Sequence, residues 1–127
     1  MILDTCFLID AEREVRRAEK GRALSFLEGC HEKTAITFTI AGELAAGRTL
    51  SRYEVWRDYI SSHILLEYSN EIAWNFGCIY RDLRKDGKMI GANDLWIAAT
   101  AVVHDMPLVT RNVDEFSRVS GLEIISY

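Results

Sequence analysis

The chain has 127 residues, which suits one domain and is too short for two ordinary ones, so we expect residues 1–127 to form a single domain. Apolar residues make up 49% and charged residues 27%, a composition that excludes a disordered or low-complexity chain. The net charge of −4 argues against a protein that coats nucleic acid by bulk positive charge, but it allows a local basic patch.

The sequence also bears on where the protein acts. Its apolar stretches fall well short of the roughly 20 residues that span a bilayer, which argues against a membrane protein. Asp4 and Asp10 interrupt what would be the apolar segment of a signal peptide, so we expect a cytoplasmic protein. Cys6, Cys30 and Cys78 are widely spaced and form no CxxC pair, and we expect them to be reduced, mostly buried thiols.

Apolar and β-branched runs alternate with helix-favouring segments along the first half of the chain. Gly21 ends a charged helical stretch, and Ser51 stands three positions before Glu54, which is the spacing of a capping box. We expect, in chain order, a strand at 1–3, a helix through 6–20, a helix at 22–30, a strand at 34–40, a helix with Glu43 in its first turn, and a helix at 51–61.

The second half of the chain continues this alternation. Asn93 is placed to cap a helix whose interior, Leu95–Val103, is apolar nearly all round and must therefore be deeply buried. Pro107 favours the end of that helix. Besides the buried helix, we expect a strand at 63–66, a helix at 70–83, a strand at 108–110 and a strand at 123–125.

Strands that alternate with helices predict an α/β fold, in which a parallel sheet lies between helical layers and right-handed crossovers join its strands. In such a sheet the ligand site lies beyond the carboxyl ends of the strands. Polar residues that follow a strand or begin a helix are therefore the candidates for a functional site.

Five residues occupy such positions: Asp4, Glu43, Asp94, Asn112 and Asp114. Carboxylates gathered at one rim repel one another and are costly to desolvate unless a cation neutralises them. Mg²⁺ or Mn²⁺ is the natural partner, because hard divalent ions take oxygen ligands. The chemistry that such a site suits is hydrolysis of a phosphodiester, in which the metal ion activates a water molecule.

Each candidate also has a purely structural explanation. An aspartate at position 4 suits a helix cap, and the acids at 43 and 94 suit the electropositive first turn of a helix. Residues 112 and 114 suit a solvated turn. Function is favoured over the structural explanation for Asp4, because apolar runs flank it. It is favoured likewise for Asp94, which begins the most apolar helix, where an uncompensated carboxylate would be partly desolvated.

Four segments together resemble one known family. They are MILDTCFLID with Asp4 and Thr5, FTIAGELAAG with Glu43, GANDLWIAATA with Asp94, and the closing segment LVTRNVDEFSRVSGLEI. In this order and at these spacings, over essentially the whole chain, they resemble the PIN-domain nucleases and among them the small VapC-type toxins. GANDLWIAATA is the most specific of the four.

The resemblance implies a three-layer α/β/α sandwich with a short central parallel sheet, dependence on Mg²⁺ or Mn²⁺, and endonucleolytic cleavage of RNA. It also implies a homodimer and a toxin–antitoxin pair, in which the tail of the cognate antitoxin lies over the acidic groove. Tyr53, Trp56 and Ile60 recur at helical spacing and offer an apolar face for a partner helix or a second protomer, although core packing is favoured for each residue taken alone.

The sequence departs from the fullest family pattern at one position. Asn112 stands directly after the TR dipeptide, where many members have an aspartate, and an amide is a weaker, uncharged ligand. Either Asp114 takes its place through a shifted loop, or the site works with three acids and Asn112 positions a water molecule. The resemblance also places Thr110 in the rim. A non-catalytic RNA- or protein-binding domain with a degenerate metal site is the alternative function.

An acidic rim repels phosphate, so an RNA-cleaving site needs positive side chains nearby. Arg81, Arg84, Lys85 and Lys88 follow the long helix toward the loop before the third acidic motif, and Arg111 is adjacent to the rim in sequence. We expect these five residues to bind RNA. A solvated helix end is the alternative for the first four, because cations are favoured at a helix C-terminus.

Overall fold

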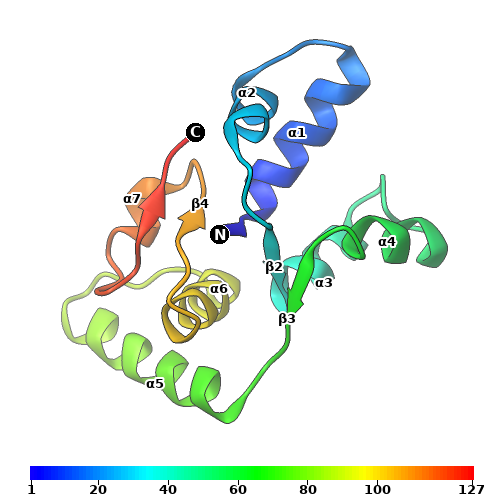
Figure 1. Cartoon of the computed structure of the whole chain (residues 1–127). Helices are drawn as coiled ribbons and strands as arrows, with labels where there is room; N and C mark the ends of the chain where they lie inside the picture. The colour runs from blue at the N-terminus through cyan, green and yellow to red at the C-terminus, as the bar shows by residue number, and fades with distance from the viewer.

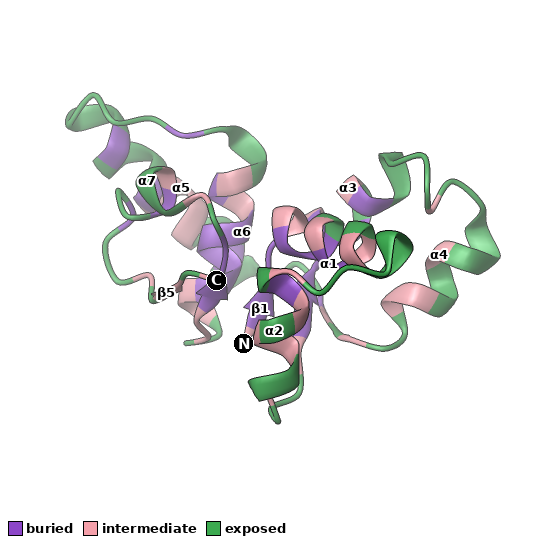
Figure 2. Ribbon diagram, turned by 90° about the horizontal axis from the view of Figure 1, so that it is seen from above, coloured by how far each residue is buried: buried purple, intermediate pink, exposed green.

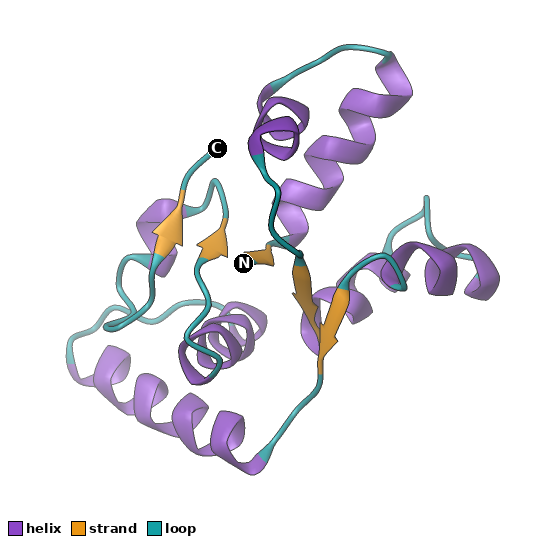
Figure 3. Cartoon of the chain, viewed as in Figure 1, coloured by secondary structure: helices purple, strands orange, loops and turns teal.

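The computed structural model describes all residues from 1 to 127. Five short strands form one parallel sheet in the order β3-β2-β1-β4-β5, as Figures 1 and 3 show. The strands are β1 (Ile2–Leu3), β2 (Ala35–Thr37), β3 (Ile64–Leu66), β4 (Leu108–Val109) and β5 (Ile124–Ile125). All five predicted strands are thus present, and each is shorter than its predicted range.

Seven helices surround this sheet. They are α1 (Thr5–Arg17), α2 (Arg22–Gly29), α3 (Phe38–Ala46), α4 (Tyr53–Ile60), α5 (Asn70–Lys85), α6 (Ala92–Val103) and α7 (Val113–Phe116). In the view from above, α5 and α6 lie on one side of β1, and α1, α3 and α4 lie on the other (Figure 2). The arrangement is the predicted α/β fold with helical layers on both faces of a short parallel sheet. None of the helices combines the length and the apolar character that a membrane span requires.

The second strand ends three residues earlier than predicted. Thr37 caps α3, because its hydroxyl accepts a hydrogen bond from the Ile40 N–H at 3.2 Å. The β-branched run that follows Ala35 suited a strand, but the threonine cap begins a helix at Phe38 instead. Glu43 consequently lies in the second turn of α3, and its predicted place in the first turn was wrong.

Three other predicted helix boundaries were also wrong. Asn93 lies inside α6, which Gly91 caps, and Arg52 rather than Ser51 caps α4, so no capping box forms. The first helix ends at Arg17 rather than near Gly21. A carboxylate explains this break: Glu14 accepts backbone N–H bonds from the start of α2, which draws that helix back against α1.

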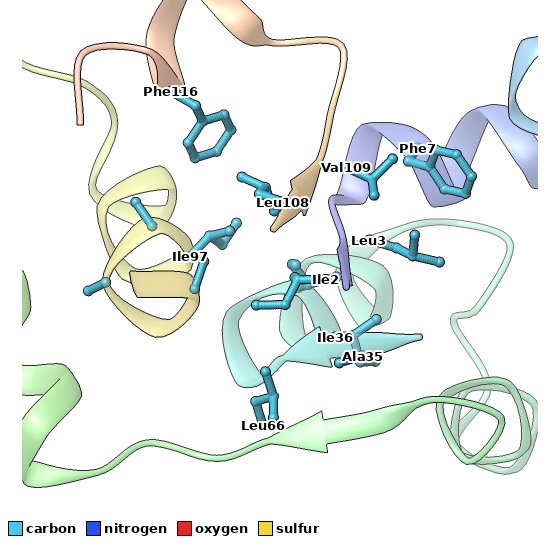
Figure 4. Close-up of a cluster of buried hydrophobic side chains, with 14 of the residues drawn as sticks. Ile2, Leu3, Phe7, Ala35, Ile36, Leu66, Ile97, Leu108, Val109 and Phe116 are labelled. Atoms are coloured by element: carbon cyan, nitrogen blue, oxygen red, sulfur yellow. The ribbon is translucent and has the colours of Figure 1, made fainter. Parts of the chain in front are cut away.

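A central part of the core lies between the sheet and α6. Ile2, Leu108 and Val109 are fully buried on the central strands, and Ile97 of α6 points toward them (Figure 4). The run Ile97–Ala101 is buried throughout, which confirms the predicted deep burial of this helix. Because α6 is locked into the core, its first turn is held at a defined position beside the sheet.

Candidate functional site

The carboxyl ends of the two central strands bring Asp4 and Thr110 together. β1 and β4 are paired neighbours, and each of these residues directly follows its strand. The Thr110 hydroxyl donates to Asp4 Oδ2 at 2.7 Å, and the Thr5 backbone N–H donates to Asp4 Oδ1 at 2.7 Å. Asp4, only 5% exposed, is thus both the cap of α1 and a rigidly held carboxylate at the end of the sheet.

Glu43 joins the starts of two other helices. Its Oε2 accepts a hydrogen bond from the Thr5 hydroxyl at the beginning of α1. Its Oε1 accepts from the Asn93 side-chain amide, in the first turn of α6, at 2.8 Å. The second turn of α3 therefore delivers this carboxylate to the same end of the sheet as Asp4, and Asn93 orients it rather than capping a helix.

Asp94 is a half-buried carboxylate that faces several negative neighbours. Desolvation raises the pKa of Asp94 to about 6, and a hydrogen bond to Glu115 with the charges of Asp4, Glu115 and Glu43 adds to the effect. Thr5 links two of these acids directly, because it donates its backbone N–H to Asp4 and its hydroxyl to Glu43. We call Asp4, Glu43, Asp94 and Glu115 the acidic cluster.

Glu115 is a member of the acidic cluster that the sequence analysis missed. Asn112 precedes the four-residue helix α7, and its amide donates to Glu115 Oε2 at 3.0 Å. The Asn112 backbone N–H donates to the Thr110 hydroxyl at 3.0 Å. Asp114, by contrast, is exposed and does not reach the cluster, although its backbone carbonyl accepts from Ser117. The spacing from Asn112 to Glu115 allows a contact within one helical turn, but it does not point toward Asp94, so no local pattern in the sequence identifies Glu115 as a site residue.

The acidic cluster has no positive partner within the protein. All five ion pairs of the molecule use other carboxylates, those of Asp10, Glu12, Glu28 and Asp58. Such a set of uncompensated oxygen donors fits a hard divalent cation such as Mg²⁺ or Mn²⁺. As the side chains lie, however, no three acidic, histidine or cysteine groups converge on one point.

Cys6 touches the cluster without adding charge to it. Its thiol donates to Asp4 Oδ2 at 3.0 Å and lies 3.4 Å from the Thr110 hydroxyl. Burial, followed by the hydrogen bond to Asp4, raises the pKa of Cys6, so the group stays a neutral thiol. Cys30 and Cys78 are also free, and like Cys6 they are only partly buried, so the prediction of mostly buried thiols was wrong.

The predicted RNA-binding cations are all exposed. Arg81, Arg84 and Lys85 lie in the last two turns of α5, and Lys88 lies in the turn that follows. None of these four forms an ion pair with a carboxylate. Arg111 differs, because its guanidinium is paired with Asp10 Oδ2 at 2.7 Å.

A sequence model of the PIN domain matches residues 1–122 of the chain. The chain belongs to the PIN-domain family. Ribonuclease VapC2 of Haemophilus influenzae is 37% identical to this PIN domain over 95 residues, which cover 71% of the chain and 72% of the relative. Ribonuclease VapC1 of Methanocaldococcus jannaschii is 32% identical over an alignment of 134 positions, which covers 98% of the chain and 85% of the relative. The predicted resemblance to VapC-type proteins is thereby confirmed.

Solved structures have the same fold as this PIN domain. VapBC2 from Rickettsia felis, bound to a DNA fragment from its promoter, superposes with a TM-score of 0.80 at 22% identity, covering 99% of this chain and 97% of that one. A toxin–antitoxin complex from Klebsiella pneumoniae superposes with a TM-score of 0.72 at 26% identity, covering 98% and 94%. The predicted fold class is confirmed over nearly the whole chain.

Proposed function

We propose that the protein is a metal-dependent endoribonuclease and that it acts in the cytoplasm as the toxin of a toxin–antitoxin pair. The observation that carries the proposal is the acidic cluster, which lies at the carboxyl end of the sheet and has no cationic partner in the protein. The ribonuclease names of the VapC relatives support the same activity.

We assign Asp4, Glu43 and Asp94 as the ligands of Mg²⁺ or Mn²⁺, and add Glu115 as the fourth acid. When bound, a divalent cation supplies an activated water molecule and charge stabilisation for phosphodiester hydrolysis. Burial first, and then the neighbouring acids, raise the pKa of Asp94, so its ionised form is disfavoured without a cation. The chain therefore has both the ligand type and the electrostatic need for the ion.

Neutral side chains hold the acids in place. Thr110 donates to Asp4, and Thr5 donates to Glu43, so each hydroxyl fixes one carboxylate and leaves the cluster without added charge. Asn112 holds Glu115 through its amide. This contact gives the asparagine a positioning role in place of the ligand role of an aspartate, and Asp114 has no role in the site.

The exposed cations bind the RNA in this proposal. These positive groups, Arg81, Arg84, Lys85 and Lys88, are free of ion pairs, so binding a phosphate would break no salt bridge. Arg81 also donates to the Cys78 sulfur at 3.4 Å and lies over the Trp74 ring. Arg111 follows Thr110 directly and lies closest in sequence to the cluster. These positive groups offset the repulsion between the acidic cluster and the phosphates beside the scissile bond.

The protein partners are a cognate antitoxin and a second copy of the chain. An apolar pocket lies between α1, α3 and α4, lined by Leu8, Ile9, Leu44, Leu50 and Tyr59, and Glu43 of the acidic cluster borders it. An antitoxin tail with apolar and basic residues would fit a groove of this character. The tryptophan of the predicted partner face, Trp56, donates its indole N–H to the Ala41 carbonyl at 2.8 Å and so joins α4 to α3.

Cleavage of a mixed pool of structured RNA tests this proposal. The purified protein is incubated with Mg²⁺, with Mn²⁺ or with EDTA, and Asp94→Asn controls for contaminating nuclease. We expect cuts at discrete positions with the wild type and metal only. If clean wild-type protein binds the RNA but cuts nothing with either metal, the non-catalytic binding domain is the better assignment.

A further inference from the structure

Three groups converge on one carboxylate of α1 that the proposed site does not use. Asp10 Oδ2 accepts from the Arg111 guanidinium at 2.7 Å and from the Tyr127 hydroxyl at 2.8 Å. Arg13 approaches Asp10 Oδ1 at 3.5 Å. The Asp10 side chain is only 15% exposed, so it is held firmly between these donors.

Tyr127 fixes this carboxylate from the protein side. Its ring packs edge-on against Phe7, with centroids 4.6 Å apart, and its hydroxyl lies 3.9 Å from the Cys6 sulfur. Burial and the hydrogen bond to Asp10 raise the pKa of Tyr127, so the phenol keeps its proton and donates it. The segment after β5 is thereby joined to α1, and Asp10 presents its charge to Arg111.

Arg111 lies beside the acidic cluster and still has free donors. It follows Thr110, whose hydroxyl contacts Asp4, and Asp10 lies six residues beyond Asp4 along α1, which is about 9 Å. One guanidinium nitrogen bonds to Asp10, and the side chain is 57% exposed. A guanidinium carries five N–H donors, so the remaining ones are available to a phosphate.

We propose that Asp10 and Tyr127 are positioning residues that hold the Arg111 guanidinium at the rim, where it binds an RNA backbone phosphate next to the scissile one. An arginine that is already ordered loses less side-chain entropy on binding than a free one. Its planar fork also suits phosphate better than a lysine would. This inference rests on the proposed ribonuclease function and adds two residues to it.

Cleavage kinetics on one hairpin RNA, chosen from those that the wild type cuts, test the inference. We expect Arg111→Ala to raise KM about tenfold. The slope of the logarithm of RNA affinity against the logarithm of salt concentration should become shallower by about one, the value for one lost phosphate contact. Asp10→Asn should raise KM about threefold to tenfold, and Tyr127→Phe should raise it about twofold. In both variants kcat should stay nearly unchanged, because only the placement of the RNA-binding arginine is lost. Asp58→Asn, at an exposed ion pair on α4, is the matched control and should keep the wild-type KM.

A double variant separates positioning from a merely structural role. If Asp10 acts through Arg111, Asp10→Asn combined with Arg111→Ala should bind the hairpin no more weakly than Arg111→Ala alone. Additive losses, or an unchanged KM in Asp10→Asn, would overturn the inference while the nuclease function stands. If Asp10→Asn does not fold, Tyr127→Phe, which keeps the ring contact with Phe7, decides the question. Fluorescence anisotropy with the same type of hairpin compares the RNA affinities of these variants without cleavage. Failure of the wild type to bind or cut RNA would overturn both proposals.

Discussion

Replacing Asp94 with asparagine is expected to stabilise the protein in EDTA. The pKa of Asp94 is raised from 3.8 to about 6, first by burial and then by its acidic neighbours. The two pKa values differ by about two, and a difference of one corresponds to about 1.36 kcal/mol, so the pKa change of Asp94 corresponds to ~3 kcal/mol of folding free energy. Because the side chain is half-buried and partly screened by solvent, we expect a gain of about 1–2 kcal/mol.

The pH dependence of this gain follows from the direction of the pKa change. A carboxyl group whose pKa is higher in the folded state than in the unfolded state costs stability when both states are ionised, above about pH 6. As the pH falls from about 6 to about 4, the folded protein takes up the proton first and gains stability. The advantage of Asp94→Asn should therefore be full at about pH 7.5 and vanish near pH 4.

Thermal unfolding followed by circular dichroism measures the effect. At about 4 °C per kcal/mol for a domain of this size, Asp94→Asn should raise Tm by about 4–8 °C at neutral pH in EDTA. Asp114→Asn is the matched control, because Asp114 is an exposed acid beside Glu115 that does not reach the cluster, and its Tm should change by less than about 2 °C. A wild-type Tm equal to that of Asp94→Asn at neutral pH would refute the reasoning, since the cluster would then carry no unbalanced charge.

Three other changes have defined outcomes. Glu14→Ala removes the carboxylate that accepts hydrogen bonds from three N–H groups at the start of α2. It should lower the free energy of unfolding, measured in urea, by about 2 kcal/mol, whereas the control Glu19→Ala should leave it nearly unchanged. Thr110→Val removes the hydrogen bond to Asp4 and should weaken Mn²⁺ binding about tenfold, as measured by calorimetry, while the fold is kept; unchanged affinity would remove the assigned role of the hydroxyl. Glu115→Gln should lower the cleavage rate at least about tenfold, and an equal loss in Asp114→Asn would instead favour the originally predicted acid.

The order of the elements could be predicted from the sequence because local patterns determine it. The apolar run of α6 signals burial by itself, and Pro107 marks the region where the chain changes from helix to strand. The position of Asp4 follows from a rule of parallel sheets, which places ligand-binding residues at the carboxyl ends of strands. Asp4 directly follows β1, whereas Asp94 lies in the first turn of α6 and follows no strand.

The finer features depend on contacts between distant segments. Thr37 suits a strand and a helix cap equally well, and only the packing of α3 decides between them. Glu115 joins the cluster because α7 turns it toward Asp94. The two residues are too far apart in the sequence for a local pattern to relate them. The contact between Asp10 and Arg111 likewise joins residues 101 positions apart. Such pairs become visible only when the chain is folded.

Titration calorimetry with Mn²⁺ tests most directly whether the acidic cluster is a metal site. The wild type is expected to bind the ion, Asp94→Asn to lose at least about tenfold in affinity, and Asp114→Asn to keep the wild-type affinity. If the wild type binds no Mn²⁺, or if Asp94→Asn binds it equally well, the acidic cluster does not hold the metal and the proposed mechanism is wrong.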